Sequence, residues 1–186
     1  MKTTVRESAG LVLTELRRTD AEMNWEQWEE LLGLITGADA IFAVGNGRSG
    51  LALRMAAMRL MHLGLTVHVV GETTTPAIKS GALLLAVSGS GKTDTVVRAA
   101  RVASESGAIV AGITASAESP LASAADHVLL VPAAEKTDRS GEKSGQYAGT
   151  LFEQMTLVLL DGVFHALWRD SGITADQMYE RHANLG

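Results

Sequence analysis

Short, almost continuously apolar runs alternate with longer amphipathic stretches through the middle of the chain. Runs of this kind predict β-strands that are buried on both faces. They lie at 40–44, 66–70, 83–87, 108–114 and 127–131. Between most of them, apolar residues recur at helical spacing, which predicts helices over 49–63 and 94–106 and a short one near 120–124.

Strands that alternate with helices favour an α/β fold, in which a parallel sheet is covered by helices on both faces. We therefore expect a three-layer αβα sandwich with a five-stranded parallel sheet in the flavodoxin-like order 2-1-3-4-5. The length of 186 residues fits one compact domain. A single domain over 1–186 is therefore expected.

Helical segments are also predicted on both sides of the sheet region, within 1–36 and 149–186. The N-terminal pair spans 4–18 and 24–36, and Asn24 is placed to cap the second helix.

The connection over 132–149 is polar and rich in Gly and Ser. A connection of that length in a compact domain is usually functional or mobile. The helix predicted over 150–169 is apolar almost all round, which indicates a buried position, for which a subunit interface is one candidate. A last short helix is expected from about Thr174.

Composition narrows the possible functions. The chain has no cysteine, which excludes disulfides, thiolate nucleophiles and zinc sites built on cysteine. Its net charge of −5, without a basic tract, argues against a nucleic-acid partner. No apolar run is long enough to span a membrane, and the first residues do not resemble a signal peptide. The histidines show no metal-ligand spacing, so we expect no metal site. The lack of cysteine is consistent with an intracellular protein, and we expect a cytoplasmic location.

Two Gly-rich loops carry the strongest chemical pattern. Each of them, 45–50 (GNGRSG) and 88–93 (SGSGKT), follows a predicted strand and opens a predicted helix. Backbone N–H groups and small hydroxyls at the positive end of a helix suit a phosphate. Two such loops on one sheet predict a single anionic ligand between them, so a phosphorylated metabolite is the leading ligand class. Arg48 and Lys92 are candidate anion contacts, unless they are simply solvated charges.

Each loop also has another interpretation. The first matches the dinucleotide fingerprint GxGxxG, with Glu72 placed to bind a ribose, although tight turns need glycine for steric reasons alone. The second resembles a P-loop, but Ala86 stands where that motif requires glycine. Thr93 or Asp94 in this loop could also serve only to cap the following helix.

Glu153 is a candidate general base. It lies in an apolar stretch, and a carboxylate among apolar side chains is more readily protonated, as a base requires. The pattern Thr150-x-x-Glu153 is also that of a capping box, which would give Glu153 a structural role only. His182, near the C-terminus, is either a functional imidazole or a solvated side chain.

Four stretches together resemble a known family. The loops 45–50 and 88–93 resemble those of the SIS (sugar isomerase) domain family. The stretches 144–154 (SGQYAGTLFEQ) and 181–185 (RHANL) narrow the resemblance to the 6-phospho-3-hexuloisomerases within it. The resemblance covers essentially the whole chain.

The resemblance implies a reversible isomerisation of D-arabino-hex-3-ulose 6-phosphate to D-fructose 6-phosphate, in the ribulose monophosphate route of formaldehyde fixation. A base removes the C2 proton, a cis-enediol(ate) forms, and the proton returns at C3. No cofactor is expected in this family. The implied binding residues are Ser88, Ser90 and Thr93 with the backbone of Gly89 at the phosphate, and Asn46, Gly47 and Ser49 at the sugar.

The resemblance also assigns catalytic roles. Glu153 would be the enediol base. His182 would move protons between the sugar oxygens or assist closure of the fructose ring, and a neighbouring subunit could supply it. Members of the family are typically tetramers, and the functional partner would be a hexulose-6-phosphate synthase.

Besides the nucleotide-binding protein that would use the loop 45–50, two alternatives remain open at this point. One is another SIS isomerase, acting on arabinose 5-phosphate or sedoheptulose 7-phosphate. The other is a sugar-phosphate sensor without enzymatic activity, which would not need Glu153 or His182.

Overall fold

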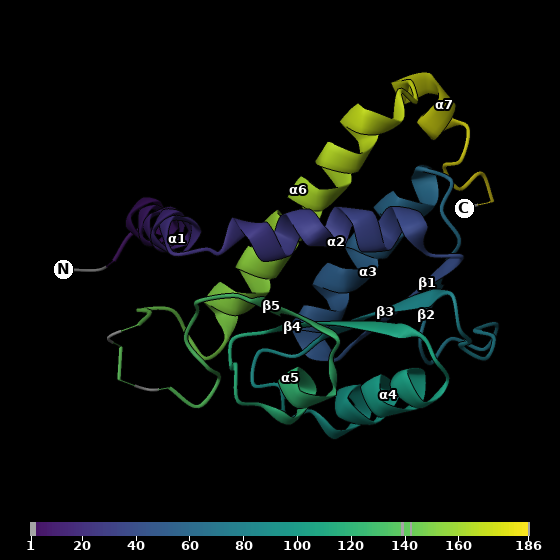
Figure 1. The fold of residues 1–186 in the computed structure, drawn as a ribbon. Coiled ribbons are helices and arrows are strands. Elements are labelled where there is room, and N and C mark those ends of the chain that lie inside the picture. The colour runs from purple at the N-terminus through teal and green to yellow at the C-terminus, as the bar shows by residue number, and fades with distance from the viewer. Residues whose placement is uncertain (1–2, 139, 142, 186) are drawn as a thin grey trace.

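The centre of the molecule is a five-stranded, all-parallel sheet in the order β2-β1-β3-β4-β5 (Figure 1). The computed structural model describes residues 3–138, 140–141 and 143–185. The strands are β1 (Ala40–Gly45), β2 (Val67–Val69), β3 (Ala82–Val87), β4 (Ile109–Thr114) and β5 (His127–Leu130). The predicted fold class and strand order are confirmed.

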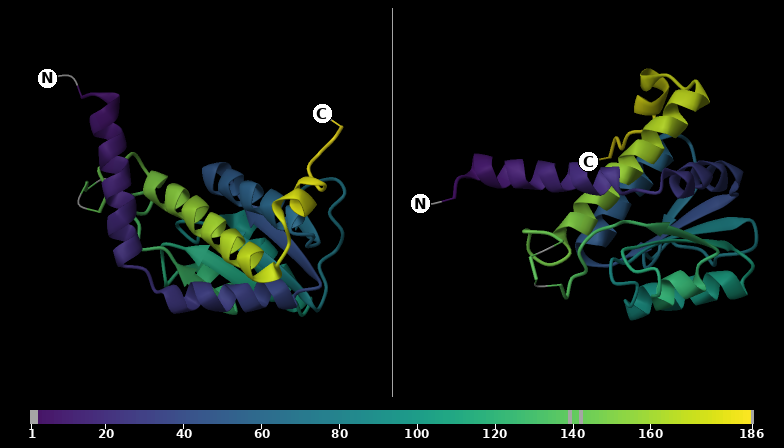
Figure 2. Two further views of the ribbon diagram at one scale, coloured as in Figure 1. Left: turned by 90° about the horizontal axis from the view of Figure 1, so that it is seen from above. Right: turned by 60° about the vertical axis from the view of Figure 1, so that its left-hand side comes forward.

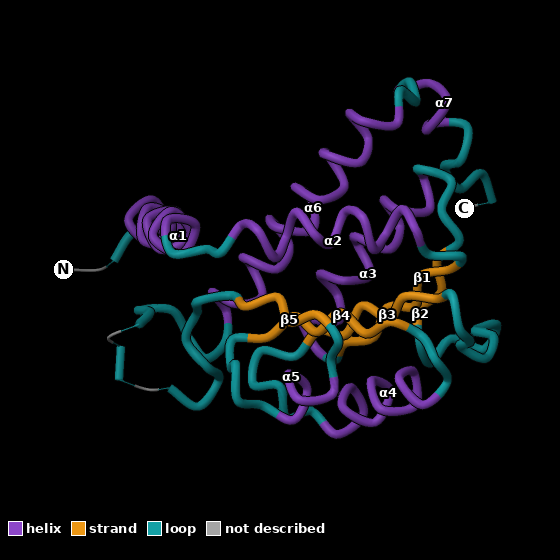
Figure 3. Tube along the Cα trace, viewed as in Figure 1, coloured by secondary structure: helices purple, strands orange, loops and turns teal. Residues whose placement is uncertain are grey.

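Helices cover both faces of this sheet, as Figure 3 shows. On one face lie α2 (Trp25–Gly37), α3 (Gly47–His62) and α6 (Thr150–Ser171). On the other face lie α4 (Asp94–Glu105) and α5 (Pro120–Ala124). The result is the three-layer sandwich that the alternation of strands and helices predicts.

Strand β3 shows why its sequence is continuously apolar. All six of its residues are buried, because neighbouring strands flank it and helices cover it from both sides. Leu83 and Leu85 belong to the core beneath α3 and α6, whereas Leu84 and Ala86 belong to the core above α4. Successive side chains alternate between the faces of a strand, so a strand covered on both faces has no polar position.

Helix α1 (Val5–Ala21) extends away from the body of the molecule (Figure 2). It begins with a capping box, in which the Thr4 hydroxyl accepts from the Glu7 N–H and the Glu7 carboxylate accepts from the Thr4 N–H. The short helix α7 (Ala175–Tyr179) begins with a second capping box at Thr174. Asn24 precedes α2 as expected, but its side chain makes no capping hydrogen bond.

Helix α6 is buried on one side only. Its buried residues pack into the core, but Val158 is 51% exposed. Within a single chain the helix is therefore not buried all round, and its predicted burial at a subunit interface stays a prediction. Of the helices in the described part of the chain, none combines the length and the apolar character needed to cross a membrane.

The strand order places a ligand crevice between β1 and β3. The chain leaves β1 toward β2 on one side, and β3 returns on the other side, so this is the point where the order reverses. Open parallel sheets bind ligands at the carboxyl ends of the strands at such a point. Gly45 and Val87 are register partners, so the two Gly-rich loops leave the sheet side by side.

Candidate active site

A cavity of about 550 Å³ lies at the carboxyl ends of β1 and β3. It is lined by both Gly-rich loops, by the end of the 132–149 connection and by the first turn of α6. Of the predicted binding and catalytic residues, Lys92 and His182 do not line it, and the others do: Asn46, Gly47, Arg48, Ser49, Ser88, Gly89, Ser90, Thr93 and Glu153. The volume is within the range of small-molecule sites.

The turn between β1 and α3 needs glycine because the backbone approaches itself closely. A Cβ added at Gly50 would lie 2.3 Å from the carbonyl oxygen of Gly45, and Gly47 has φ of +57°. Steric constraints therefore account for the GxGxxG pattern. Glu72, the carboxylate that the dinucleotide interpretation requires, is outside the cavity lining and pairs with Arg54 at 2.6 Å.

Hydrogen bonds within the loop between β3 and α4 hold its two ends together. Ser88 Oγ and Thr93 Oγ1 are 2.9 Å apart, and the Ser88 carbonyl accepts from the Gly91 N–H at 2.9 Å. Thr93 is the N-cap residue of α4, yet its side chain makes no capping bond. The interpretation of Thr93 as a side-chain cap is therefore wrong, because its hydroxyl contacts Ser88 instead.

Helix α6 packs directly on this loop. A Cβ added at Gly89 would lie 3.0 Å from Phe152 Cδ1, so the ring occupies the space that a side chain would need. From the other side, the Gly89 carbonyl accepts from the Ala115 N–H at 3.0 Å and from Thr114 Oγ1 at 3.2 Å. The loop and the start of α6 therefore have a fixed relative position.

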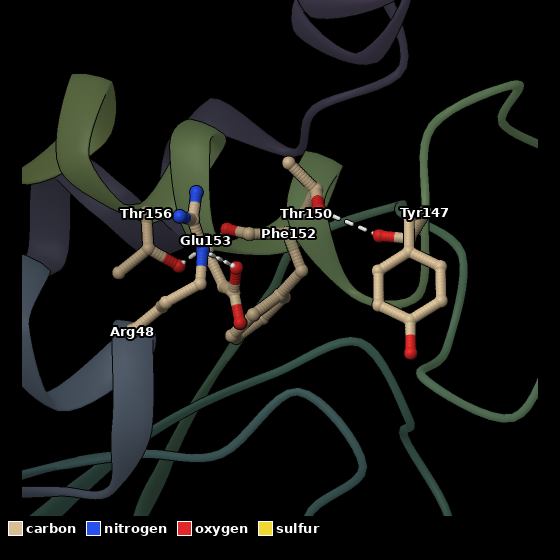
Figure 4. A network of polar contacts seen from close by, with 6 residues as sticks. All are labelled: Arg48, Tyr147, Thr150, Phe152, Glu153 and Thr156. Atoms are coloured by element: carbon tan, nitrogen blue, oxygen red, sulfur yellow. Dashed lines mark hydrogen bonds and ion pairs between the residues drawn. The ribbon is translucent and has the colours of Figure 1, made fainter.

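Glu153 faces the cavity from the first turn of α6 and pairs with Arg48 of α3 (Figure 4). Arg48 Nε donates to Glu153 Oε2 at 2.5 Å, and the two side chains are 63% and 21% exposed. The predicted apolar setting is therefore incomplete, because a guanidinium stands beside the carboxylate.

The capping box expected at the start of α6 is not formed. The N-cap of α6 is Gly149, and no side chain caps it. Thr150 is already inside the helix and donates through Oγ1 to the Tyr147 carbonyl at 2.5 Å (Figure 4). The capping role considered for Glu153 is therefore wrong, because its carboxylate contacts Arg48 across the cavity instead.

Three helix N-termini meet at the cavity. Its lining includes Gly47 and Arg48 of α3, Thr93 at the start of α4, and Gly149 and Thr150 at the start of α6. The N–H groups in the first turn of a helix have no partner within that helix, and they carry its partial positive charge. This arrangement suits a phosphorylated ligand.

Comparison with known proteins agrees with this geometry. The family model described as SIS domain matches residues 34–161, which include both loops and Glu153. The chain belongs to the SIS domain family.

Several relatives of this SIS protein match along its whole length. It is 49% identical to the 3-hexulose-6-phosphate isomerase of Mycobacterium gastri over 181 residues, which cover 97% of this chain and 91% of that protein. It is 38% identical to the enzyme of the same name from Bacillus subtilis, over the full length of both. A Methanococcus jannaschii structure, whose authors infer 3-hexulose-6-phosphate isomerase function, matches with a TM-score of 0.84, 30% identity and coverage of 97% and 99%.

The SIS site also contains residues that the two loops did not indicate. Lys136 and Tyr147 line the cavity from the long connection, whereas Lys92 does not line it. The lysine side chain at the cavity is therefore that of Lys136 and not that of Lys92. The signal was the unusual length and polarity of 132–149, which marks a functional segment without singling out its residues.

His182 lies at the opposite end of α3. Its ring stacks on that of His62, with centroids 4.0 Å apart, and Arg181 Nη1 donates to the His62 carbonyl at 3.0 Å. At 1.5 Å per residue, the helix separates His62 from Arg48 by about 20 Å. One SIS chain therefore does not bring His182 to Glu153.

The His62 ring is buried, and burial lowers the pKa of His62, with electrostatic interactions with His182 and Arg59 adding to the effect. Its Nδ1 atom has no hydrogen-bond partner among the described residues. A proton on this ring would therefore be a poorly compensated buried charge. Of the described His, Asp and Glu residues, no three lie close enough to hold a metal ion.

Proposed function

We propose that this protein interconverts D-arabino-hex-3-ulose 6-phosphate and D-fructose 6-phosphate through an enediolate. The observation that carries the proposal is that Glu153 shares one cavity with a hydroxyl-rich loop and three helix N-termini. The 49% identity to an enzyme named 3-hexulose-6-phosphate isomerase supports this substrate over other phosphosugars.

In this proposal the phosphate binds at the loop between β3 and α4. Hydroxyls of Ser88, Ser90 and Thr93 would donate to its oxygens together with the Gly89 N–H. Charge-assisted hydrogen bonds of this kind are stronger than neutral ones. Asn46, Gly47 and Ser49 would contact the sugar from the loop after β1.

Glu153 would then act on the sugar carbons. Its carboxylate takes the proton from C2 of the ketose and returns it at C3, or the reverse, so the carbonyl moves between C3 and C2. Arg48 would stabilise the negative charge that develops on the enediolate oxygen. Anchoring the phosphate fixes the distance from the sugar to the base, and such positioning contributes several kcal/mol to catalysis. The net reaction moves hydrogen within one molecule, so it requires no redox partner.

His182 would reach this site from a neighbouring subunit of a homotetramer, where it would move protons between the sugar oxygens. The separation of His182 and Glu153 within one chain supports an arrangement that uses two chains.

We also propose a cellular setting. A charged sugar phosphate does not cross a bilayer unaided, so the enzyme would act where its substrate is made, in the cytoplasm. The supplier would be a hexulose-6-phosphate synthase of the ribulose monophosphate pathway.

A coupled assay tests the proposal. Ribulose 5-phosphate, formaldehyde and a hexulose-phosphate synthase supply the substrate, and glucose-6-phosphate isomerase and dehydrogenase report fructose 6-phosphate as NADPH. NADPH formation that depends on this protein supports the proposal. Its absence with active controls would contradict it, and arabinose 5-phosphate and sedoheptulose 7-phosphate would then be tried as substrates.

A further inference from the structure

Glu15 of α1 is a buried carboxylate that holds the chain leading into the cavity. It is 5% exposed. Its Oε2 atom accepts from Ser144 Oγ at 2.6 Å and from Gln146 Nε2 at 2.9 Å, while its Oε1 atom accepts from the Gly145 N–H at 2.7 Å. A residue of the N-terminal helix thus binds three successive residues that lie some 130 positions later in the sequence.

Burying a carboxylate is unfavourable unless donors compensate for the lost water. Burial raises the pKa of Glu15, but the hydrogen bonds from Ser144, Gln146 and Gly145, with the charge of Arg18, outweigh it and hold the pKa below its usual value. Three donors converge on an acceptor that is ionised at neutral pH. A glutamine at position 15 would place its NH₂ group, which is itself a donor, against these donors, and one or more of the hydrogen bonds would be lost.

The residues held by Glu15 lead directly into the cavity wall. Tyr147, Ala148, Gly149 and Thr150 follow Gln146 without interruption, and all four line the cavity. Ala148 has φ of +51°, which is strained for a residue with a side chain. Such a conformation persists only where its surroundings fix it. Glu15 holds the chain on one side of it, and Thr150, through its bond to the Tyr147 carbonyl, holds the other.

We infer that Glu15 is a positioning residue for the active site: by holding 144–146, it keeps the cavity wall over 147–150 in the conformation that binds substrate. Arg18, one turn further along α1, strengthens this attachment by donating to the Lys143 carbonyl. Only the identity of the substrate in this inference rests on the proposed function.

The inference also accounts for an otherwise puzzling feature of α1. The helix extends from the body of the molecule, and most of its surface is exposed (Figure 2). Such a helix has no general need for a buried charge. A buried carboxylate is explained if the helix serves to orient the connection after β5.

Glu15→Gln tests this role by steady-state kinetics. Without the attachment, the wall samples other conformations, and the apparent affinity falls in proportion to the lost population of the competent one. We expect KM to rise about tenfold while kcat stays within about twofold, since bound substrate restores the wall. Ser144→Ala removes one of the three donors to the Glu15 carboxylate and should also raise KM. The two changes should be non-additive, because they break the same contact.

Glu22→Gln is the matched control, since Glu22 is exposed at the end of the same helix. It should leave KM unchanged. If Glu15→Gln lowers only the melting temperature, or if Glu22→Gln raises KM equally, Glu15 is merely structural and the inference is wrong.

Hydrogen exchange separates this inference from the proposed function, because it needs no turnover. In Glu15→Gln and Ser144→Ala, amides in 143–150 should exchange faster than in the wild type, and added fructose 6-phosphate or inorganic phosphate should slow them again. Unchanged exchange there would overturn the inference even for an active isomerase. Faster exchange in a protein that fails the coupled assay would support the inference and contradict the function.

Discussion

At the scale of the residue, the two carboxylates with proposed roles at the site have opposite surroundings. Glu153 is partly exposed beside the guanidinium of Arg48. Glu15 is buried and receives three hydrogen bonds from a connecting segment. In the proposed mechanism the first exchanges a proton with the substrate, whereas the second has to keep its charge.

Glu153→Gln should abolish turnover and retain binding. The amide preserves the shape of the side chain but cannot take a proton from carbon, so kcat should fall on the order of a thousandfold. Fructose 6-phosphate should still raise the melting temperature, since the phosphate contacts are unchanged. Turnover close to the wild-type value would show that Glu153 is not the base.

Gly89→Ala should disturb the catalytic geometry through Phe152. The added methyl group would lie 3.0 Å from the buried ring, so the ring has to give way, and we expect the first turn of α6, which carries Glu153, to move with it. We expect kcat/KM to fall about 10- to 100-fold. Gly33→Ala is the control, because nothing lies within 4 Å of a Cβ there. In that helical position alanine should stabilise the protein by about 0.5–1 kcal/mol without changing kinetics. Equal kinetics in both variants would refute the role of the Phe152 contact.

At the scale of the element, α3 joins two sites with different chemistry. Its N-terminus lines the cavity, while its C-terminus carries His62 under His182, with Arg59 and Arg181 nearby. The cationic side chains at this end are favourable to the helix dipole. They are unfavourable to a proton on His62.

The stability of the protein should therefore fall as the pH drops below about 6.5, the ordinary pKa of histidine. The pKa of His62 is lowered in the folded state, so in this range the unfolded chain binds more protons and the free energy of unfolding decreases with falling pH. Thermal melts between pH 7.5 and 5.5 measure this slope. His62→Phe should flatten it, whereas His165→Gln, on the exposed side of α6, should not. An identical slope in both variants would contradict the assignment to His62.

At the scale of the whole molecule, the proposed mechanism requires more than one chain. Glu153 and His182 lie near opposite ends of α3. If one active site takes residues from two subunits, a mixture of two inactive variants can regain activity.

Glu153→Gln and His182→Ala should each be inactive alone and active together. After dissociation and reassembly of an equal mixture, a site at a two-fold interface can combine an intact Glu153 with an intact His182. Random pairing should restore roughly a quarter of the wild-type activity. No recovery, with reassembly verified by size, would place both residues in one subunit or remove His182 from the mechanism.

The sequence was sufficient to predict the sheet, because its signals are local. The run 83–87 is apolar at every position, and a strand covered on both faces requires this. The loops 45–50 and 88–93 could be predicted as a site for the same reason, since topology alone places the ends of neighbouring parallel strands together.

The remainder of the site depends on contacts between distant parts of the chain. No local pattern connects Glu15 to Ser144 or Arg48 to Glu153, and the positions differ by more than a hundred in each pair. The pattern Thr150-x-x-Glu153 is that of a capping box, but a four-residue motif does not show that Arg48 lies across the cavity and pairs with Glu153 instead. Lys136 and Tyr147 were missed since they lie in a segment without periodicity.

The convergence of three helix N-termini has a consequence for how ionic strength acts on the protein. The chain as a whole is negative, with a net charge of −5, while donors that suit a phosphate line this crevice. A dianionic metabolite is thus repelled at long range and attracted only on contact. Salt screens the long-range field beyond about 8 Å at physiological strength but screens buried, short-range contacts much less. Added salt should therefore speed the association of substrate with this protein. In an enzyme whose basic surface attracts an anionic substrate, added salt slows association instead.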